Sequence, residues 1–409
     1  MNFKELTYLM VIISIFISSV IETDIYLPAL PDMMDYFSQS EETIQKLLIW
    51  NFIGFCASGL IYGPISDSFG RKKPLMIALG MFFIGSFITL IADNFEFMLV
   101  GRLLQGLGSG GCFTLGTAII FDIFQEKKAI QALNKINIIV PFIMASAPLL
   151  GGYLNQKFGF RSNFLAIFIC VSVSFSTCAL FLKETLIQNK RIKFNLRTTL
   201  INFRRVITCL PFIKLTLIIS LLFAGFLVFL SSSALLFVIQ FGITKSIYPI
   251  FHTSLLLAYL IASLSCDRFI TKFGINKVKH LGLYSVVLGG VLLLFVSFFF
   301  PKNALLLTIV MLPYAFGFVW TQTPYVTEVM ELIPDIKGIS ASVLTSFRLL
   351  ITASALGLSS FLYNATIYPV AYIILFFVLL ISILIFSYEG YFKSINIISS
   401  TRSKEKFRD

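Results

Sequence analysis

The stretch Gly63-Pro64-Ile65-Ser66-Asp67-Ser68-Phe69-Gly70-Arg71-Lys72-Lys73 decides the fold. It is a charged, glycine-bracketed segment between two apolar runs, at residues 44–65 and 74–92, each about long enough to cross a bilayer as a helix. We interpret it as a short loop that holds two membrane helices antiparallel, because Gly63 and Gly70 allow close backbone approach and positive φ. The cations that follow Gly70 lie at the membrane edge and indicate that this side is cytoplasmic.

The composition places most of the chain in lipid. Of the 409 residues, 57% are hydrophobic and 13% are charged, and the mean hydropathy is +0.90. Soluble domains are nearer half apolar and a quarter charged. With 45 Phe, the chain has more apolar surface than one soluble core can bury. The formal net charge of +12 is therefore not evidence of nucleic-acid binding, and its meaning depends on where the cations lie.

Twelve apolar segments follow one another along the chain. Only helices and closed barrels satisfy their backbone hydrogen bonds in lipid, and these runs lack the strict alternation of barrel strands. The sequence therefore predicts an all-α polytopic membrane protein. The segments cover residues 6–28, 44–66, 74–92, 97–123, 132–154, 163–183, 213–240, 248–271, 279–300, 304–326, 339–362 and 368–388.

The distribution of Lys and Arg predicts the orientation. If both termini are cytoplasmic, 25 of the 32 cations fall on the cytoplasmic side and two, Arg102 and Arg348, lie inside helices. This asymmetry is the one expected of an even number of helices with both termini inside. The five cations left on the outer side are Lys46, Lys157, Arg161, Lys245 and Lys302.

A basic segment and an internal repeat divide the chain into two halves. The segment Asp267 to Lys277 resembles a degraded copy of the first loop, and its Gly274 lies 204 residues after Gly70. The basic segment between the halves is interpreted as an amphipathic linker on anionic headgroups. We therefore predict an N-terminal six-helix bundle at 1–183, a linker at 184–212, a C-terminal six-helix bundle at 213–390 and a basic tail at 391–409.

Two motifs carry a resemblance to a known family. Gly63-x-x-x-Asp67-x-x-Gly70-Arg71-Lys72, between the second and third apolar runs, resembles the loop 2–3 signature of the major facilitator superfamily. Asp24-x-Tyr26-Leu27-Pro28-Ala29-x-Pro31-x-Met33 resembles the helix-one signature of the Bcr/CflA (bicyclomycin-resistance) branch of drug:proton antiporters. The resemblance implies two pseudo-symmetric six-helix bundles with a substrate site at the midplane between them, in a monomer.

Helix one supplies the candidates for proton coupling. Carboxylates inside a membrane span are costly and are usually functional, so Asp24 is the first choice for the proton carrier. Glu22 is the second, since two residues turn a helix by about 200° and the two carboxylates cannot face one cavity squarely. The alternative for Asp24 is a helix-end cap at the water boundary.

Arg102 completes the predicted proton-coupling set. Its segment Arg102-x-x-Gln105-Gly106 resembles a superfamily motif in helix four. Arg102 and Asp24 lie at similar predicted depths, so we expect a switchable interaction between them, direct or through Gln105 or water. The alternative is a structural Arg that is paired permanently.

The resemblance also implies a gate and an antiporter motif. Gly63, Asp67, Gly70, Arg71 and Asp122 correspond to the conformational gate that latches the two halves in the outward-facing state. The segment Ala147-Pro148-Leu149-Leu150-Gly151-Gly152 resembles the Gly-Pro-x-x-Gly-Gly signature of exchangers, with Ala147 in place of the first Gly. Pro148, Gly151 and Gly152 therefore favour export.

The predicted substrate site combines aromatic and polar side chains with one cation. Arg348 is near the midplane, no acid shares its helix, and its partner must come from elsewhere or from a substrate, so an amphiphilic or anionic compound is expected. The predicted substrate-binding residues are Tyr26, Asn51, Gln105, Tyr259, Tyr314, Trp320, Gln322 and Arg348.

Several function classes are disfavoured by what the sequence lacks. It has no Walker-type Gly-x-x-x-x-Gly-Lys-Ser/Thr, no Ser/His/Asp constellation, and six scattered cysteines without metal-ligand spacing. We therefore expect no enzyme, no metal and no cofactor, with a proton gradient as the energy source and no nucleic-acid partner. The prediction is a multi-pass transporter of the bacterial inner membrane that exports small amphiphilic compounds or drugs in exchange for protons, by alternating access. The alternatives are a dedicated exporter of an endogenous metabolite such as a siderophore, a proton-coupled importer, or a non-transporting sensor.

Overall fold

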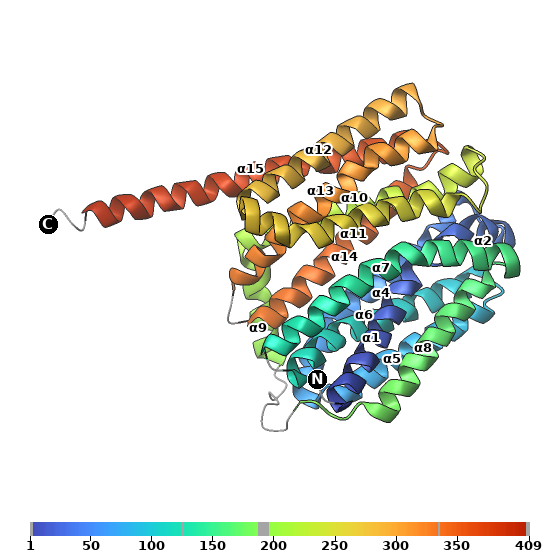
Figure 1. The fold of residues 1–409 in the computed structure, drawn as a ribbon, viewed down its shortest axis with the longest axis horizontal. Helices are drawn as coiled ribbons and strands as arrows, with labels where there is room; N and C mark the ends of the chain where they lie inside the picture. Colours follow the sequence, from blue (N-terminus) through green and yellow to red (C-terminus); the bar gives the residue numbers. More distant parts are fainter. Residues whose placement is uncertain (1–2, 125, 187–195, 334–335, 406–409) are drawn as a thin grey trace.

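The computed structural model describes residues 3–124, 126–186, 196–333 and 336–405, and it confirms the predicted all-α class (Figure 1). The first half contains α1 (Phe3–Asp24), the 3-10 turn η1 (Leu27–Ala29), α2 (Leu30–Phe37), α3 (Glu41–Ile44), α4 (Lys46–Phe69), α5 (Lys72–Ile91), α6 (Phe95–Ile123), α7 (Glu126–Phe158) and α8 (Arg161–Phe181). The second contains α9 (Leu196–Thr208), α10 (Leu210–Leu235), the π-turn η3 (Leu236–Gln240), α11 (Tyr248–Phe273), α12 (Ile275–Phe299), α13 (Ala304–Glu331), α14 (Lys337–Phe361) and α15 (Tyr368–Glu405).

Within the described residues, 11 helical segments are long and apolar enough to cross a membrane. The fifth predicted segment, residues 132–154, falls within α7, which lies between α6 and α8. The long helices therefore follow the twelve segments predicted from hydropathy. The predicted linker at 184–212 lies partly outside the described residues, and its described part contains the amphipathic helix α9.

Two ends of the bundle can be distinguished in Figure 1. The first residues of α1, the turn between α4 and α5, and α9 lie at one end, which we call the basic end because Arg71, Lys72 and Lys73 lie there. α15 continues past the bundle at this end. The short helices α2 and α3 lie at the other end, which we call the opposite end. That the basic end faces the cytoplasm stays a prediction.

Glycines bring α4 and α6 into backbone contact. A Cβ built on Gly54 would lie 2.3 Å from the Leu103 carbonyl oxygen, and one on Gly106 would lie 2.0 Å from the Asn51 carbonyl oxygen. Small residues allow such close approach in membranes, where packing rather than the hydrophobic effect holds helices together. The contact places Asn51 and Arg102, on facing helices, beside each other.

The predicted loop is shorter than the stretch that begins at Gly63, because α4 continues to Phe69, three residues beyond the predicted helical segment 44–66. Gly63 and Pro64 lie inside the helix, and the turn begins only at Gly70, whose φ is +92°. The reason is packing: a Cβ on Gly63 would lie 3.2 Å from Ser342 Oγ of α14, so this glycine serves close approach between the two halves. Only Gly70 provides the positive φ.

The internal repeat is visible in backbone geometry. Gly70 ends α4 with φ 92° and ψ 169°, and Gly274 ends α11 with φ 83° and ψ 154°. Both values lie in a region that is essentially restricted to glycine. The two predicted copies of the motif therefore form the same turn, each between two long antiparallel helices.

Replacing either turn glycine should destabilise the protein. We expect Gly70→Ala and Gly274→Ala each to lower the free energy of unfolding by about 1–3 kcal/mol, because a side chain is strained at this φ and ψ. Thermal unfolding of the purified protein measures the effect. Gly80→Ala is the control, since Gly80 lies within α5 and its nearest neighbour atom would be 4.0 Å away. Turn variants as stable as Gly80→Ala would contradict the strain argument.

Candidate functional site

The end of α1 is a break in the helix at which three buried polar side chains occur within five residues. α1 ends at Asp24, and the chain continues through the 3-10 turn η1 into α2. Pro28 and Pro31 contribute to this break, because proline has no N–H to donate to the helical ladder. The backbone changes direction after Asp24, so Glu22 and Asp24 precede the change and Tyr26 follows it. All three side chains are buried.

Glu22 forms an ion pair with Arg102 in the interior of the first half. Arg102 Nη1 donates to Glu22 Oε2 at 2.9 Å, and both side chains are fully buried. The carboxylate also accepts hydrogen bonds from Asn51 Nδ2, at 3.2 Å to each oxygen, and from Ser109 Oγ at 3.0 Å. The sequence predicted Asp24 as the partner of Arg102, but the structure places Glu22 against the guanidinium.

The remaining donors of Arg102 are also engaged. Its Nη1 donates to Gln105 Oε1 at 2.8 Å, its Nη2 to the Tyr26 hydroxyl at 3.1 Å, and its Nε to the Leu47 carbonyl oxygen at 3.3 Å. The guanidinium also lies over the Tyr26 ring, 4.4 Å from the centroid. Tyr26, Asn51 and Gln105 were predicted to bind substrate; in this structure they surround the Glu22–Arg102 pair.

Asp24 has a different environment from Glu22. Its side chain is only 5% exposed, and its Oδ2 has no hydrogen-bond partner among the described residues. A water-boundary cap would be exposed, so this burial disfavours that alternative. Asp24 is thus a buried carboxyl group on which one oxygen remains free.

The glycine pair of α7 brings the end of α1 beside the start of α11. A Cβ on Gly151 would lie 1.7 Å from the Ile25 carbonyl oxygen, and one on Gly152 would lie 2.6 Å from Pro249 Cγ. Ile25 follows Asp24 directly, and Pro249 follows Tyr248 directly. The two neighbouring glycines therefore hold Asp24 and Tyr248, which belong to different halves, near the same point.

Tyr248 leads to a buried histidine that the sequence analysis did not single out. The Tyr248 hydroxyl lies 3.0 Å from His252 Nδ1 and 3.3 Å from Ser233 Oγ. His252 is 1% exposed, and its Nε2 has no partner within the described residues. The available signal was a Tyr and a His four residues apart in the first turns of α11, which places both on one face of the helix.

The basic end holds the predicted charge cluster, and it lies within the first half. Arg71 donates to Asp67 Oδ1 at 2.6 Å and to Asp122 Oδ2 at 2.8 Å. Glu184, which the sequence analysis missed, accepts from the Arg71 backbone N–H at 2.8 Å. Burial opposes the charge of Glu184, but hydrogen bonds from backbone N–H groups at residues 71, 72, 185 and 186 outweigh it and lower the pKa of this carboxyl group. The cluster's role as a gate stays a prediction.

Contacts between the halves nearer this end come from α4 and α14. Ser346 Oγ donates to the Cys56 carbonyl oxygen at 2.9 Å. A Cβ on Gly59 would lie 2.8 Å from Ser346 Oγ, so glycine is needed for this approach. The predicted gate residue Gly63 lies one turn further along α4 and also faces α14, at Ser342.

Polar contacts also join the halves at the opposite end. Asp32 forms an ion pair with Lys245 and accepts from Asn155 Nδ2 at 2.5 Å. Glu41 accepts from Gln240 Nε2 at 2.8 Å and from the Tyr363 hydroxyl. These side chains connect α2 and α3 of the first half to the second half, so polar contacts hold the halves together at this end as well.

The second half contains a cation without a described acidic partner. Arg348 Nε has no hydrogen-bond partner in the described part of the chain, and its guanidinium carbon lies 5.0 Å from the centroid of the Phe223 ring. A desolvated cation–π contact contributes about 2 kcal/mol, whereas removing an ion from water costs several kcal/mol. The ring therefore offsets only part of the cost of burying Arg348.

The other predicted substrate residues of this half fall into two groups. Tyr314 and Trp320 are engaged by the backbone, since the Tyr314 hydroxyl donates to the Leu222 carbonyl at 3.1 Å and Trp320 Nε1 to the Ala262 carbonyl at 3.1 Å. Gln322 Oε1 has no described partner, and Tyr259 packs against other aromatic rings. Together with Arg348, Tyr259 and Gln322 are therefore the predicted substrate residues of this half whose side chains form no hydrogen bond among the described residues.

Comparison with known proteins identifies the family. The model of the Major Facilitator Superfamily matches residues 8–356. The chain belongs to the major facilitator superfamily. It is 26% identical over 306 residues to the uncharacterized MFS-type transporter YdgK of Bacillus subtilis, covering 73% of this chain and 75% of that one.

Two further comparisons agree with this family. The chain is 23% identical over 342 residues to the bicyclomycin resistance protein homolog of Haemophilus influenzae, covering 81% of this chain and 83% of the relative. Its fold is similar to that of the xylose transporter XylE from E. coli, with a TM-score of 0.73 at 15% identity, covering 93% of this chain and 97% of that one. The chain is thus a multi-pass membrane protein of a transporter family.

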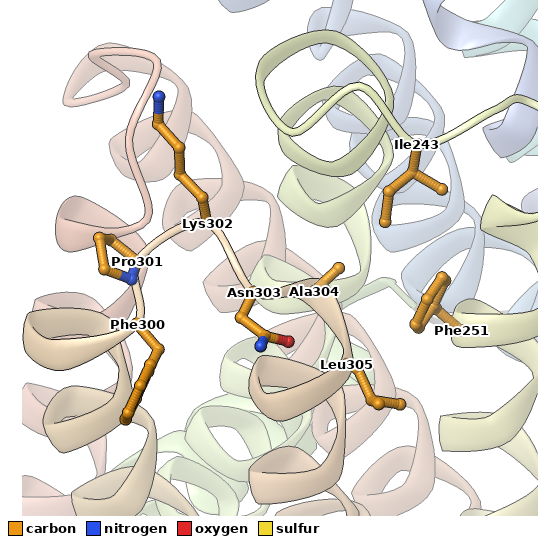
Figure 2. Close-up of a pocket in the computed structure, with 8 residues that line it drawn as sticks. All are labelled: Ile243, Phe251, Phe300, Pro301, Lys302, Asn303, Ala304 and Leu305. Carbon is orange, nitrogen blue, oxygen red and sulfur yellow. The ribbon is translucent and has the colours of Figure 1, made fainter.

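A surface hollow of about 600 Å³ lies at the turn between α12 and α13 (Figure 2). It is lined by the turn between α12 and α13, with Lys302 and Asn303, and by Ile243 and Phe251 on the facing side. Its mostly apolar wall and its place at the opposite end fit a crevice between lipid-facing helices better than a transport site. Among the described residues, no group of three His, Cys, Asp or Glu side chains is placed to hold a metal ion.

Breaking the Glu22–Arg102 pair from one side should be costly. We expect Glu22→Gln to lower the free energy of unfolding by about 3–5 kcal/mol, because it leaves a buried guanidinium without its counter-charge. The double variant Glu22→Gln/Arg102→Met should recover much of this loss, since no uncompensated charge remains. Thermal unfolding of wild type, both single variants and the double variant forms the cycle. Purely additive losses would show that the pair is not coupled.

The two glycines of α7 should respond differently to alanine. Gly151→Ala places a methyl group on the backbone oxygen of Ile25, which cannot move without displacing α1, so we expect strongly reduced folded yield. Gly152→Ala meets the edge of the Pro249 ring in the other half, so we expect a folded protein with an altered contact between the halves. Size-exclusion profiles compare the yields. Equal behaviour of the two variants would contradict the assigned contacts.

Proposed function

We propose that the protein is a proton-coupled exporter of small organic compounds in the bacterial inner membrane, working by alternating access. The observation that carries the proposal is the buried carboxyl group of Asp24, whose Oδ2 has no hydrogen-bond partner in the described part of the chain. A carboxylate oxygen without a donor in an apolar interior is costly. The group is therefore stable here when it carries a proton or when a conformational change brings it to water.

The contrast with Glu22 supports Asp24 as the coupling residue. Glu22 is neutralised by Arg102 and accepts hydrogen bonds from two further side chains, so its charge is compensated in this conformation. Protonating Glu22 would leave Arg102 as an unpaired buried cation. Protonating Asp24 has no such consequence, so of the two carboxyl groups Asp24 is the one that can exchange a proton at low cost.

The position of Asp24 at the junction of the halves links proton exchange to conformation. The Gly151–Gly152 pair packs against Ile25 of α1 and Pro249 of α11, so any movement of the halves at this point displaces the surroundings of Asp24. Under the proposal, Tyr248 and His252 provide hydroxyl and imidazole groups along which a proton reaches Asp24. A ligand that favours one arrangement of the halves then changes proton affinity, which is the thermodynamic requirement for coupling.

Two observations favour export of a drug-like compound. The Pro148-x-x-Gly151-Gly152 motif resembles the exchanger signature and forms the junction between the halves. The Haemophilus influenzae relative carries the name bicyclomycin resistance protein homolog.

Alternating access requires contacts between the halves to break at each end in turn. The Asp32–Lys245 and Glu41–Gln240 contacts would break when the opposite end opens, and the α4–α14 contact would break when the basic end opens.

Proton movement in proteoliposomes tests the proposal. With an imposed pH gradient and a panel of drugs, wild type should show drug-evoked proton flux. Asp24→Asn should lose this flux, because an amide side chain does not bind and release protons near neutral pH. Asp35→Asn is the control, since Asp35 is an exposed acid near the same end of the chain. The ratio of drug-evoked flux in the variants to that in wild type is the measurement.

Three other outcomes have distinct meanings. Flux that survives in Asp24→Asn would move the coupling site to Glu22 or to the second half. Flux lost equally in Asp35→Asn would point to a general loss of folded protein. No flux with any drug in wild type would contradict drug export and favour a dedicated exporter of an endogenous metabolite.

A further inference from the structure

Arg348 is an uncompensated cation deep in the second half. It lies eleven residues after the start of the 25-residue helix α14, and it is not among the cations that form ion pairs in the described structure. The other intramembrane cation, Arg102, has an ion pair and donates to three other residues. Arg348 instead has a free Nε and the face of Phe223.

No carboxylate at this depth is available from the helices that pack against α14. The described side chains of α14 and of α15 up to Tyr388 include no Asp or Glu, and α10 has none. Asp67 of α4 belongs to the Arg71 cluster at the basic end, and Glu328 of α13 forms an ion pair with Lys279. Glu331 at the end of α13 and Glu42 of α3 are exposed at the two ends of the bundle. Glu41 of α3 is engaged at the opposite end.

An aromatic cluster lies next to this cation. Phe226 and Phe318 have ring centroids 5.7 Å apart, Tyr259 lies 5.8 Å from Phe318, and Phe223 lies 6.0 Å from Phe318. The four rings come from α10, α11 and α13, and Phe223 is also the ring that Arg348 contacts. Phe223, Tyr259 and Arg348 are only partly buried, so this edge of the cluster is not sealed by protein.

This combination suits a flat molecule with a negative charge. A guanidinium presents a planar fork of donors that matches a carboxylate or sulfonate with two parallel hydrogen bonds. Aromatic rings prefer stacked or edge-to-face contact with another ring. A ligand that has both features would supply the counter-charge that Arg348 lacks and extend the aromatic packing.

We propose that Arg348 and the aromatic cluster of Phe223, Phe226, Tyr259 and Phe318 bind organic anions in which a carboxylate or sulfonate is attached to an aromatic ring. That such an anion is also the exported compound rests on the proposed function. The binding itself does not, because it requires only the geometry around Arg348.

Equilibrium binding without a pH gradient tests the site. The purified full chain is titrated by calorimetry with naphthalene-2-sulfonate, with the neutral naphthalene-2-sulfonamide and with the cationic 2-naphthylmethylammonium. We expect wild type to bind the sulfonate about ten- to a hundredfold more tightly than the sulfonamide, as charge-assisted hydrogen bonds predict. The cation should bind most weakly.

Variants assign the preference to Arg348. Arg348→Gln should abolish the preference for the sulfonate while leaving sulfonamide binding within about threefold of wild type. Arg348→Lys keeps the charge without the planar fork and should retain part of the preference. Lys302→Gln is the charge control, because it removes one exposed cation far from the cluster. Phe223→Leu should weaken sulfonate and sulfonamide equally.

Several results would overturn the proposal. Equal binding of the three probes by wild type, tighter binding of the ammonium compound, or unchanged sulfonate affinity in Arg348→Gln would each do so. If Arg348→Gln does not fold, Arg348→Lys and Phe223→Leu decide the question. Anion binding without drug-evoked proton flux would contradict drug export and keep this site. Proton-coupled flux without anion preference would refute the site and keep the exporter.

Discussion

The buried ion pair between Glu22 and Arg102 constrains the architecture of the first half. Neither charge is tolerable alone in this interior, so α1, α4 and α6 must meet where the pair forms. Gly54 and Gly106 make this meeting possible by bringing the backbones of α4 and α6 into contact beside it. The three helices must therefore pack so that the pair can form. The side chains that hydrogen-bond to the pair are engaged by it in this conformation.

The pairing of Glu22 with Arg102 leaves two other intramembrane charges, Asp24 and Arg348, without an ionic partner among the described residues. Arg102 takes Glu22, so Asp24 is left without a cation, and Arg348 is left without an anion in the other half. The first is a group that a proton can neutralise, and the second is a group that an anionic ligand can neutralise. In this interpretation the protein completes its charge balance with the two species that it is proposed to exchange.

Hydropathy was sufficient to predict the all-α class and the positions of the membrane helices. Lipid requires every backbone group to be bonded within a helix, so runs of about 20 apolar residues leave little choice. The turn glycines Gly70 and Gly274 were also predictable, because their motif repeats and glycine alone accepts their φ. For Gly63 the sequence left two roles open, because a glycine for close approach and a glycine for a turn look alike in sequence.

The sequence predicted the charged residues of the candidate site, but it did not predict which carboxylate pairs with Arg102. The periodicity of a helix places Glu22 and Asp24 on nearly opposite faces, but which face meets α6 depends on how α1 is rotated about its axis. Depth does not decide it either, because two residues differ by only about 3 Å along a helix. Tyr248 and His252 were missed for a related reason. Their importance arises from a contact between the halves that is made through Gly151 and Gly152, far earlier in the chain.

The uncompensated Arg348 has a consequence for energetics if both proposals hold. Exporting a monovalent anion from a cell with a negative interior moves charge in the favourable direction, and importing a proton moves charge in the same favourable direction. Each elementary charge contributes about 2.3 kcal/mol per 100 mV of membrane potential. A neutral substrate exchanged for one proton gains this term once, whereas an aromatic anion gains it twice. The site at Arg348 would therefore let the membrane potential act on the substrate directly as well as on the proton bound at Asp24.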